Sequence, residues 1–310
     1  MSLSFRLGRI PVRILPSFFL TTVVLNFGLV QADPRKLVVW LAIVFASVLV
    51  HELGHALAGI SFGLQPRIDL HGFGGTTSWA AAGRTSPAKR IVISLAGPGM
   101  GFLAGLAVMA LRAAFGRPPA EPDGSLADFA YGNLLFVNFG WGILNLLPML
   151  PLDGGNVLTH ALDIAMPGRG ERPARMVSLI VAALATAGAI ATQWWWPALL
   201  GGSFIASNWR GLKDLKAREH DAPMRTELEA AYAALDAKDG QRVLALARPV
   251  ALGSQTAPVR AEALQLLAFG FLLEGRVADA DAAIAALPQG FAPNASFLDL
   301  RATLTAAGSS

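Results

Sequence analysis

Residues 37–63, LVVWLAIVFASVLVHELGHALAGISFG, decide the fold of this chain of 310 residues. The stretch is long and apolar enough for a helix that crosses a bilayer, which needs about 20 residues. On a helix, positions four apart lie about 40° from one another around the axis, so the imidazoles of His51 and His55 point to one place. Two neutral imidazoles suit zinc, and Glu52 beside them is placed to take the proton of a zinc-bound water. A chance occurrence of the pattern His-Glu-x-x-His on a buried helix is the alternative.

The composition is that of a membrane protein with a modest soluble part. Hydrophobic residues make up 54% of the chain and charged residues 15%, whereas soluble domains average about 25% charged residues. The absence of cysteine excludes disulfides and thiolate ligands, so a metal site must use histidine and carboxylate. The net charge of +4 comes from basic residues beside apolar segments rather than in one stripe, which favours a membrane surface over nucleic acid.

The pattern of apolar segments predicts an all-α polytopic membrane protein with about six transmembrane helices. The first segment has the features of a signal peptide as well, but we favour a retained helix because more spans follow. Alternation over residues 68–79, with Gly72 and Gly74 at turn positions, predicts a small β-hairpin at the membrane surface. The expected spans cover about 17–30, 37–62, 88–115, 129–150, 174–192 and 197–208, the last being short for a full crossing.

A second motif follows the fourth expected span, at residues 145–155, NLLPMLPLDGG. Its two prolines break the helix and its two glycines allow close backbone approach. Broken helix at membrane depth is tolerated where it lines a cavity, so Asp153 is a candidate third zinc ligand. Asn145 is expected to bond to the site or to a substrate backbone, because lipid offers its amide no partner. A simple helix cap is the alternative for Asp153.

Together the two motifs resemble the site-2 protease family of intramembrane zinc metalloproteases. Ala96-Gly97-Pro98 resembles the middle helix of that family, residues 68–75 resemble its glycine-ended hairpin, and the similarity covers about residues 10–215. The resemblance implies one Zn²⁺ per chain. The residues it assigns are His51, His55 and Asp153 as ligands, Glu52 as catalytic base, and Asn145, Pro148, Gly74 and Gly75 as positions that bind substrate or line the site.

The function that this resemblance implies is cleavage of transmembrane segments of other proteins by zinc-activated water, with Glu52 as general base. A membrane-tethered transcription regulator, an anti-sigma factor or a signal-peptide remnant would each fit as substrate. A zinc or proton transporter is one alternative, but it needs polar groups across the whole membrane thickness. A catalytically silent scaffold is another, and the intact Glu52 argues against it.

The chain is expected to divide into a metalloprotease core, residues 1–218, and a soluble helical tail, residues 219–310. Residues 268–287 resemble a tetratricopeptide helix pair, and the tail is either a cytoplasmic interaction platform or a packing or dimer-forming appendage. Arginine and lysine gather in the N-terminal, 64–90, 166–175 and 210–218 segments, opposite the acidic 116–128 loop. The positive-inside rule therefore places both termini in the cytoplasm of a bacterial cell, with zinc in the inner half of the membrane. Tail helices are expected at about 224–237, 240–252, 257–274, 276–287 and 296–306.

Overall fold

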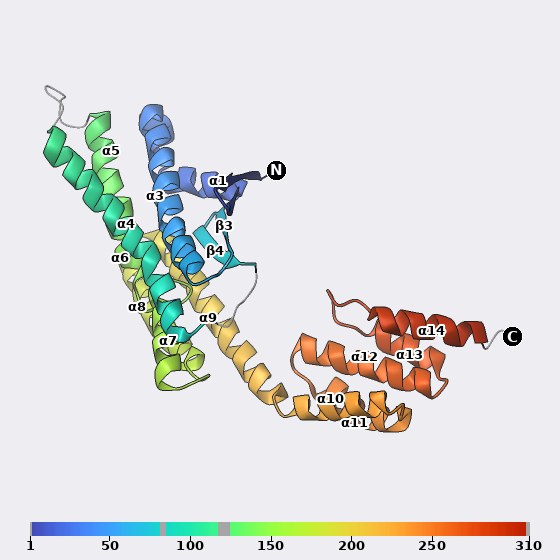
Figure 1. Cartoon of the computed structure of the whole chain (residues 1–310). Coiled ribbons are helices and arrows are strands. Elements are labelled where there is room, and N and C mark those ends of the chain that lie inside the picture. Colours follow the sequence, from blue (N-terminus) through green and yellow to red (C-terminus); the bar gives the residue numbers. More distant parts are fainter. Residues whose placement is uncertain (1, 81–84, 117–124, 308–310) are drawn as a thin grey trace. The chain divides into compact units, whose positions relative to one another are not determined.

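The computed structural model describes residues 2–80, 85–116 and 125–307 (Figure 1). Most of the acidic 116–128 loop, on which the expected topology drew, therefore lies outside the described residues. Contacts within the chain separate two compact units, Met1–Trp209 and Arg210–Ser310. The functional division of the chain into a core and a tail stays a prediction.

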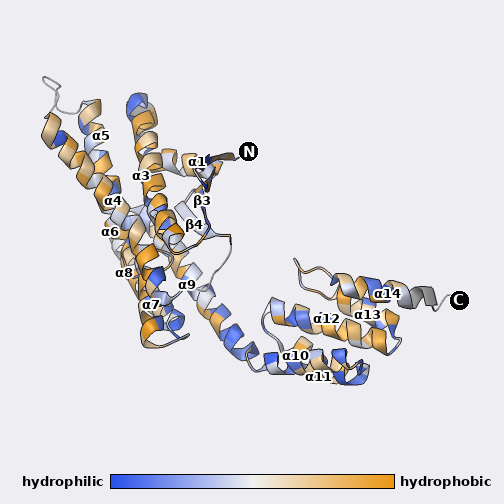
Figure 2. Cartoon of the chain, viewed as in Figure 1, coloured by the Kyte–Doolittle hydropathy of each residue, from blue (hydrophilic) through white to orange (hydrophobic). Residues whose placement is uncertain are grey.

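Three of the described helices in the first unit are long and apolar enough to cross a membrane, namely α3 Pro34–Ser61, α4 Pro87–Phe115 and α8 Glu171–Ala191. Their apolar character is visible along most of their length in Figure 2. Asp33 and Ser86 cap the first two of these helices by accepting hydrogen bonds from backbone N–H groups, and each is followed by a proline at the first turn. The start of the motif helix is thus set locally by its sequence.

The remaining helices of this unit depart from a simple series of six spans. The first expected span is divided at Asn26 and Phe27, and the fourth passes through a π-helical turn. The fold is mostly helical with a small sheet, and the six spans stay a prediction. These shorter elements are α1 Pro16–Leu25, α2 Gly28–Ala32, α5 Leu126–Leu135, η1 Phe136–Gly140, α6 Trp141–Asn145 and α7 Asp153–Ala165, and α9 runs over Trp195–Asp221.

A four-stranded sheet with the strand order β1-β2-β3-β4 packs beside α3. Strands β3 Pro66–His71 and β4 Gly74–Trp79 form the hairpin expected from sequence. The sequence analysis missed β1 Leu3–Leu7 and β2 Ile10–Ile14, because the arginines there suggested only the basic flank of a helix. Strand β2 pairs with β3 in parallel, so the first hairpin extends the second into one sheet.

Apolar burial attaches this sheet to the helix that carries the motif. Every second residue of β2 is buried, and Ile68 and Leu70 of β3 are fully enclosed. These strands share a core with Phe18 of α1 and with Val48 and Ala56 of α3. Full burial of one such side chain contributes about 1.5–3 kcal/mol. The sheet is therefore held firmly against the turn of α3 that contains His51 and His55.

The second unit is helical, and its helices occupy the ranges expected from sequence. Its core contains several side chains that are fully or almost fully buried, among them Val243, Val250, Leu266, Leu272 and Phe297. Whether these helices form tetratricopeptide repeats stays a prediction. They are α10 Met224–Asp236, α11 Gly240–Gly253, α12 Ala257–Leu273, α13 Val277–Ala285 and α14 Ala295–Ala307.

Asp221, the last residue of α9, fixes the connection between α11 and α12 in this unit. Its side chain accepts hydrogen bonds from the backbone N–H of Gln255, at 2.8 Å, and from the backbone N–H and hydroxyl of Thr256, at 2.8 and 2.6 Å. Burial raises the pKa of Asp221, but these three donors outweigh it, and the net pKa lies below its ordinary value. The ionised carboxylate therefore stabilises the connection.

We expect Asp221→Ala to expose this connection, because hydrogen bonds to a charged group contribute about 1.5–3 kcal/mol. Hydrogen exchange at the amides of Gln255 and Thr256 in the full chain should become about 10-fold faster or more. Because folding lowers the pKa of Asp221, its stabilising effect is complete above the ordinary pKa of about 3.9 and is lost as the pH falls through the lower native pKa. The matched control is Asp236→Ala, at an exposed position. Equal exchange rates in both variants would contradict this role.

Candidate metal centre

His51, Glu52 and His55 lie on one buried turn of α3, with exposed fractions of 9, 4 and 8%. Small residues let α4 pass directly beside this turn. A side chain added at Gly54 would overlap the carbonyl oxygen of Ala96, and one added at Gly97 would overlap the imidazole of His55. The glycines are thus required by close helix approach, and they enclose the motif between two helices.

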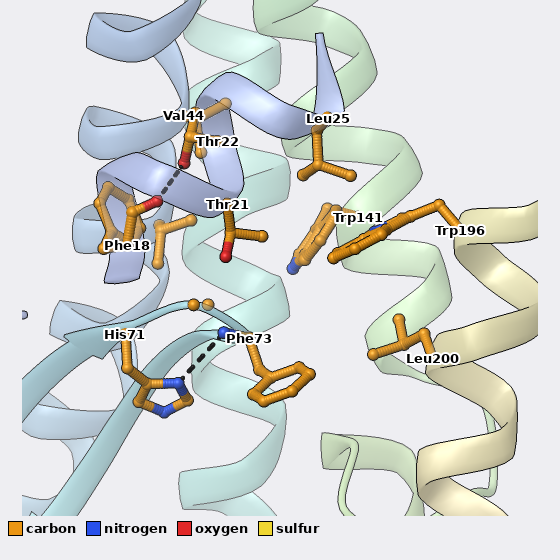
Figure 3. Close-up of a pocket in the computed structure, with 13 residues that line it drawn as sticks. Phe18, Thr21, Thr22, Leu25, Val44, His71, Phe73, Trp141, Trp196 and Leu200 are labelled. Carbon is orange, nitrogen blue, oxygen red and sulfur yellow. Dashed lines mark hydrogen bonds between the residues drawn. The ribbon is translucent and has the colours of Figure 1, made fainter. Parts of the chain in front are cut away.

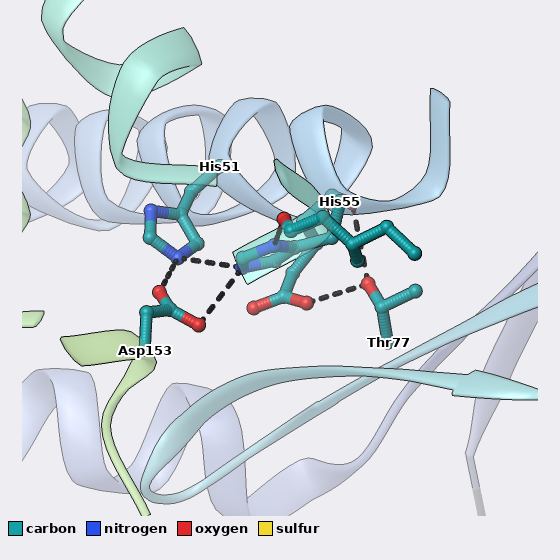
Figure 4. A network of polar contacts seen from close by, with 6 residues as sticks. His51, His55, Thr77 and Asp153 are labelled. Atoms are coloured by element: carbon teal, nitrogen blue, oxygen red, sulfur yellow. Dashed lines mark hydrogen bonds and ion pairs between the residues drawn. The ribbon is translucent and has the colours of Figure 1, made fainter. Parts of the chain in front are cut away.

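Asp153, the first residue of α7, reaches the two imidazoles from a different part of the chain (Figure 4). Its Oδ2 lies 3.1 Å from Nε2 of His51, and its Oδ1 lies 3.3 Å from Nε2 of His55. The two Nε2 atoms are 3.2 Å apart. Three side chains from two segments separated by about a hundred residues therefore converge on one point.

The spacing of these atoms suits a tetrahedral zinc site. With zinc–nitrogen bonds of about 2.0–2.1 Å, neighbouring ligand atoms in a tetrahedron lie about 3.3–3.4 Å apart. The two Nε2 atoms are 3.2 Å apart and each lies 3.1–3.3 Å from a different oxygen of Asp153, which comes close to that value. His51, Glu52 and His55 also form a cluster with ligand atoms within 4.8 Å of one another. The donors present thus fit zinc by both chemistry and spacing.

A backbone carbonyl sets the orientation of His55. Its Nδ1 lies 2.7 Å from the carbonyl oxygen of Ile93 on α4. A carbonyl oxygen only accepts hydrogen bonds, so Nδ1 carries the proton and the lone pair of Nε2 points towards Asp153. This is the arrangement in which a neutral imidazole binds a metal, with its second nitrogen held by an acceptor.

Glu52 lies beside the imidazoles of His51 and His55 and also contacts strand β4. The hydroxyl of Thr77 donates a hydrogen bond of 2.7 Å to Oε2 of Glu52 (Figure 4). A side chain added at Gly75 would overlap the side chain of Glu52, so the glycine permits β4 to approach it. The sequence analysis missed Thr77, whose partner lies 25 residues away, while Gly75 lies where site-lining was expected.

The loop over residues 146–152 holds Asp153 in place through contacts with two later helices. The backbone N–H of Leu150 donates to the hydroxyl of Ser178 on α8, at 2.9 Å. The carbonyl of Leu150 accepts from the amide of Asn208 on α9, at 2.7 Å. Side chains added at Gly154 or Gly155 would overlap the backbone of this same loop. Ser178 and Asn208, both almost fully buried, were missed because nothing in the local sequence marks their partner.

The surroundings of two other expected site residues, Asn145 and Pro148, do not indicate a role for them at the site. Asn145 is half-buried, and among the described residues its side chain has no hydrogen-bond partner. Pro148 is exposed. A buried amide lies instead in the preceding turn η1, where Asn138 donates to the hydroxyl of Ser47, one turn before His51, at 2.9 Å. The role of Asn145 at the site therefore stays a prediction.

A small apolar pocket of about 40 Å³ lies beside the hairpin turn (Figure 3). It includes Gly74, another expected site-lining residue, and Val48, one turn before Glu52. Figure 3 shows that Trp141, Trp196 and Phe18 all line this pocket. Its lining comes from α1, α3, the turn between β3 and β4, α6 and α9. An apolar surface thus adjoins the polar centre.

We expect Asn208→Ala to destabilise the first unit, because it leaves the buried carbonyl of Leu150 without its side-chain donor. The cost of such a loss is about 1–3 kcal/mol. The midpoint of thermal unfolding of the purified chain in detergent should fall, and the neighbouring exposed Ser207→Ala should leave it unchanged. An Asn208→Ala variant that melts with the wild type would show that the loop holds Asp153 without this clamp.

Comparison with known proteins gives relatives for part of the chain. The chain is 33% identical over 170 residues to Rip3 of Mycobacterium tuberculosis, a candidate zinc metalloprotease, covering 52% of this chain and 40% of that protein. It is 34% identical over 119 residues to another candidate zinc metalloprotease, from Synechocystis, covering 37% of this chain and 29% of that protein. The chain thus spans less than half the length of these curated relatives. No protein-family model matches it.

The fold has a counterpart among solved structures. The site-2 protease from Methanocaldococcus jannaschii superposes with a TM-score of 0.52 at 21% sequence identity, covering 68% of this chain and 95% of that one. The names of the relatives and this fold together support the site-2 protease family. The resemblance drawn from the two motifs is confirmed at that level. The relatives' names and the cluster of His51, Glu52 and His55 also support zinc as the metal.

Proposed function

We propose that this chain is an intramembrane zinc metalloendopeptidase that hydrolyses peptide bonds in transmembrane segments of other proteins. One observation carries the proposal. His51 and His55, on an apolar helix of 28 residues, converge within 3.1–3.3 Å on the carboxylate of Asp153 from a separate segment, and Glu52 lies beside them on the same helix. Ionisable groups at such depth are costly and are kept where they function.

His51, His55 and Asp153 would hold the metal in this proposal. Bound there, zinc would supply a Lewis acid that polarises the scissile carbonyl and lowers the pKa of a water molecule. Their three donors leave one tetrahedral position for water or substrate. The Ile93 carbonyl keeps the proton of His55 on Nδ1, away from that position.

Glu52 would act as the general base and then as the general acid. Its carboxylate takes a proton from the attacking water and passes it to the nitrogen of the leaving amine. The hydroxyl of Thr77 engages Oε2 of Glu52, and among the described residues no hydrogen bond is made to Oε1, which would receive the proton. Thr77 is thus a positioning residue, since it acts on the reaction only through Glu52.

The substrate segment would bind as an extended strand along β4. A peptide bond in a helix is hydrogen-bonded and must be unwound before attack, and an edge strand offers unpaired backbone groups to receive it. Strand β4 is the outer strand of the sheet, and its Gly75 and Thr77 contact Glu52. A segment added at that edge would lie next to the proposed base.

The proposed substrate is a membrane protein. This agrees with the apolar helices of the chain, which indicate that the chain itself is a membrane protein. A membrane-tethered transcription regulator, an anti-sigma factor or a signal-peptide remnant each offers a suitable segment. The orientation with both termini in the cytoplasm and a partner for the helical tail are parts of the same proposal.

If the substrate binds as an added strand, the effect of blocking its backbone N–H groups should alternate from one residue to the next. In a strand, only alternate N–H groups face the partner strand. Single N-methylation at every second residue flanking the scissile bond of a transmembrane peptide substrate should therefore lower kcat/KM about five-fold. This loss corresponds to one hydrogen bond of about 1 kcal/mol. Zinc content should stay constant throughout. Uniform losses, or none, would contradict strand addition.

Glu52→Gln separates the chemistry from metal binding. The amide keeps the size of the side chain but cannot take a proton. Zinc content, measured by atomic emission, should stay near the wild-type value, because the three proposed ligands are unchanged. Cleavage of a transmembrane model substrate should fall by about 10²–10⁴-fold.

His55→Ala is the matched control, and it should lose both zinc and turnover. Robust cleavage by zinc-loaded Glu52→Gln protein would overturn the proposed mechanism. Zinc lost from Glu52→Gln to the same extent as from His55→Ala would count against the assignment of separate roles.

A further inference from the structure

The outer face of the sheet carries a basic groove at the end opposite β4. It has a volume of about 280 Å³ and contains the side chains of Arg6, Arg13 and Arg67. The pairing register puts them on one face, since Ser4 is opposite Arg13, Arg6 is opposite Pro11, and Arg13 is opposite Asp69. The sequence analysis counted these arginines only towards membrane topology.

Charge in the groove is only partly neutralised. Asp69 binds Arg13 at 2.7 Å and Arg67 at 3.4 Å, and the side chains of these arginines remain 40% and 48% exposed. Arg6 is exposed and, among the described residues, has no ion-pair or hydrogen-bond partner. Three guanidinium groups and one carboxylate leave two positive charges around a groove open to solvent. Such a site suits an anion with several acceptor oxygens, such as a phosphate.

The opposite face of β1 is apolar and extends beyond the core. Leu3, Phe5 and Leu7 are 65, 37 and 36% exposed. They are opposite Ile14, Val12 and Ile10, which are buried against α1 and α3. Strand β1 therefore continues the apolar face of the sheet past the helices that cover it. One strand thus presents apolar side chains on one face and arginine on the other.

We propose that β1 and this groove form a site for anionic phospholipid, with the headgroup phosphate at Arg6, Arg13 and Arg67 and the acyl chains against Leu3, Phe5 and Leu7. The sheet adjoins apolar helices directly, since β2 ends at Ile14 and α1 begins at Pro16. Strand β3 begins at Pro66, shortly after α3 ends at Ser61. The site therefore lies where an apolar helix meets the membrane surface.

A lipid fits this surface better than other anions do. Free phosphate would use the arginines but not the exposed apolar face, and an acidic peptide would likewise leave the apolar side chains of β1 uncovered. A basic surface next to an apolar one is the general pattern of protein segments that bind anionic membrane surfaces. The lipid alone accounts for both faces of β1.

Native mass spectrometry of the full chain in neutral detergent tests the proposal. Dioleoylphosphatidylglycerol should bind more tightly than dioleoylphosphatidylcholine. Arg6→Gln should weaken the anionic lipid about five-fold, which corresponds to about 1 kcal/mol for one arginine at a membrane surface, and should leave the zwitterionic lipid unchanged. Because Arg6 is exposed and unpaired among the described residues, its replacement should not alter the melting temperature.

Arg35→Gln is the matched control, because Arg35 is exposed at the opposite end of α3 and should not contribute to the site. The lipid affinities of this variant should equal those of the wild type. Equal weakening in both variants would indicate nonspecific attraction and overturn the site, as would an unchanged affinity in Arg6→Gln. Tighter binding of hexaglutamate, or of inorganic phosphate, than of phosphatidylglycerol would overturn the lipid assignment.

Discussion

The close approach of α3 and α4 is the constraint on which the candidate metal centre depends. Gly54 faces the carbonyl of Ala96, and Gly97 faces the two imidazoles, with no room for a side chain at either glycine. This contact brings the carbonyl of Ile93 to Nδ1 of His55 and so selects the tautomer that leaves Nε2 available. In apolar surroundings unpaired polar groups are expensive, so each member of the cluster must find its partner within the protein. Helix packing therefore determines the chemistry available at this turn.

The position of Asp153 imposes a different requirement, because this residue follows a stretch of irregular backbone. A helix satisfies its own backbone, whereas a break between apolar helices needs donors and acceptors from elsewhere. Ser178 and Asn208 supply them to the two polar backbone groups of Leu150. The position of Asp153, a proposed ligand, thus depends on α8 and α9. Relatives that keep the metal should need some equivalent of this support.

Sequence reasoning reached the parts of the site that depend on local spacing. His51, Glu52 and His55 are linked by the helical repeat, and Asp153 stands in a motif of prolines and glycines whose effect on the backbone is general. Thr77 and Asn208 could not be found this way, since their partners lie 25 and 58 residues away and many threonines and asparagines look alike. Strands β1 and β2 were missed for another reason. Alternating Ile10, Val12 and Ile14 are a strand signal, but the intervening arginines also fit a basic helix flank.

The strand order separates the two surfaces that the sheet offers. Strand β4, at one end, contacts Glu52, whereas β1, at the other end, carries the exposed Arg6. Three strand spacings of about 4.8 Å put the outer strands roughly 14 Å apart. Lipid bound at β1, as proposed above, would therefore anchor the sheet at the end remote from the strand that contacts Glu52. Burial of β2 and β3 against α3 fixes the sheet to the helix that bears His51 and His55.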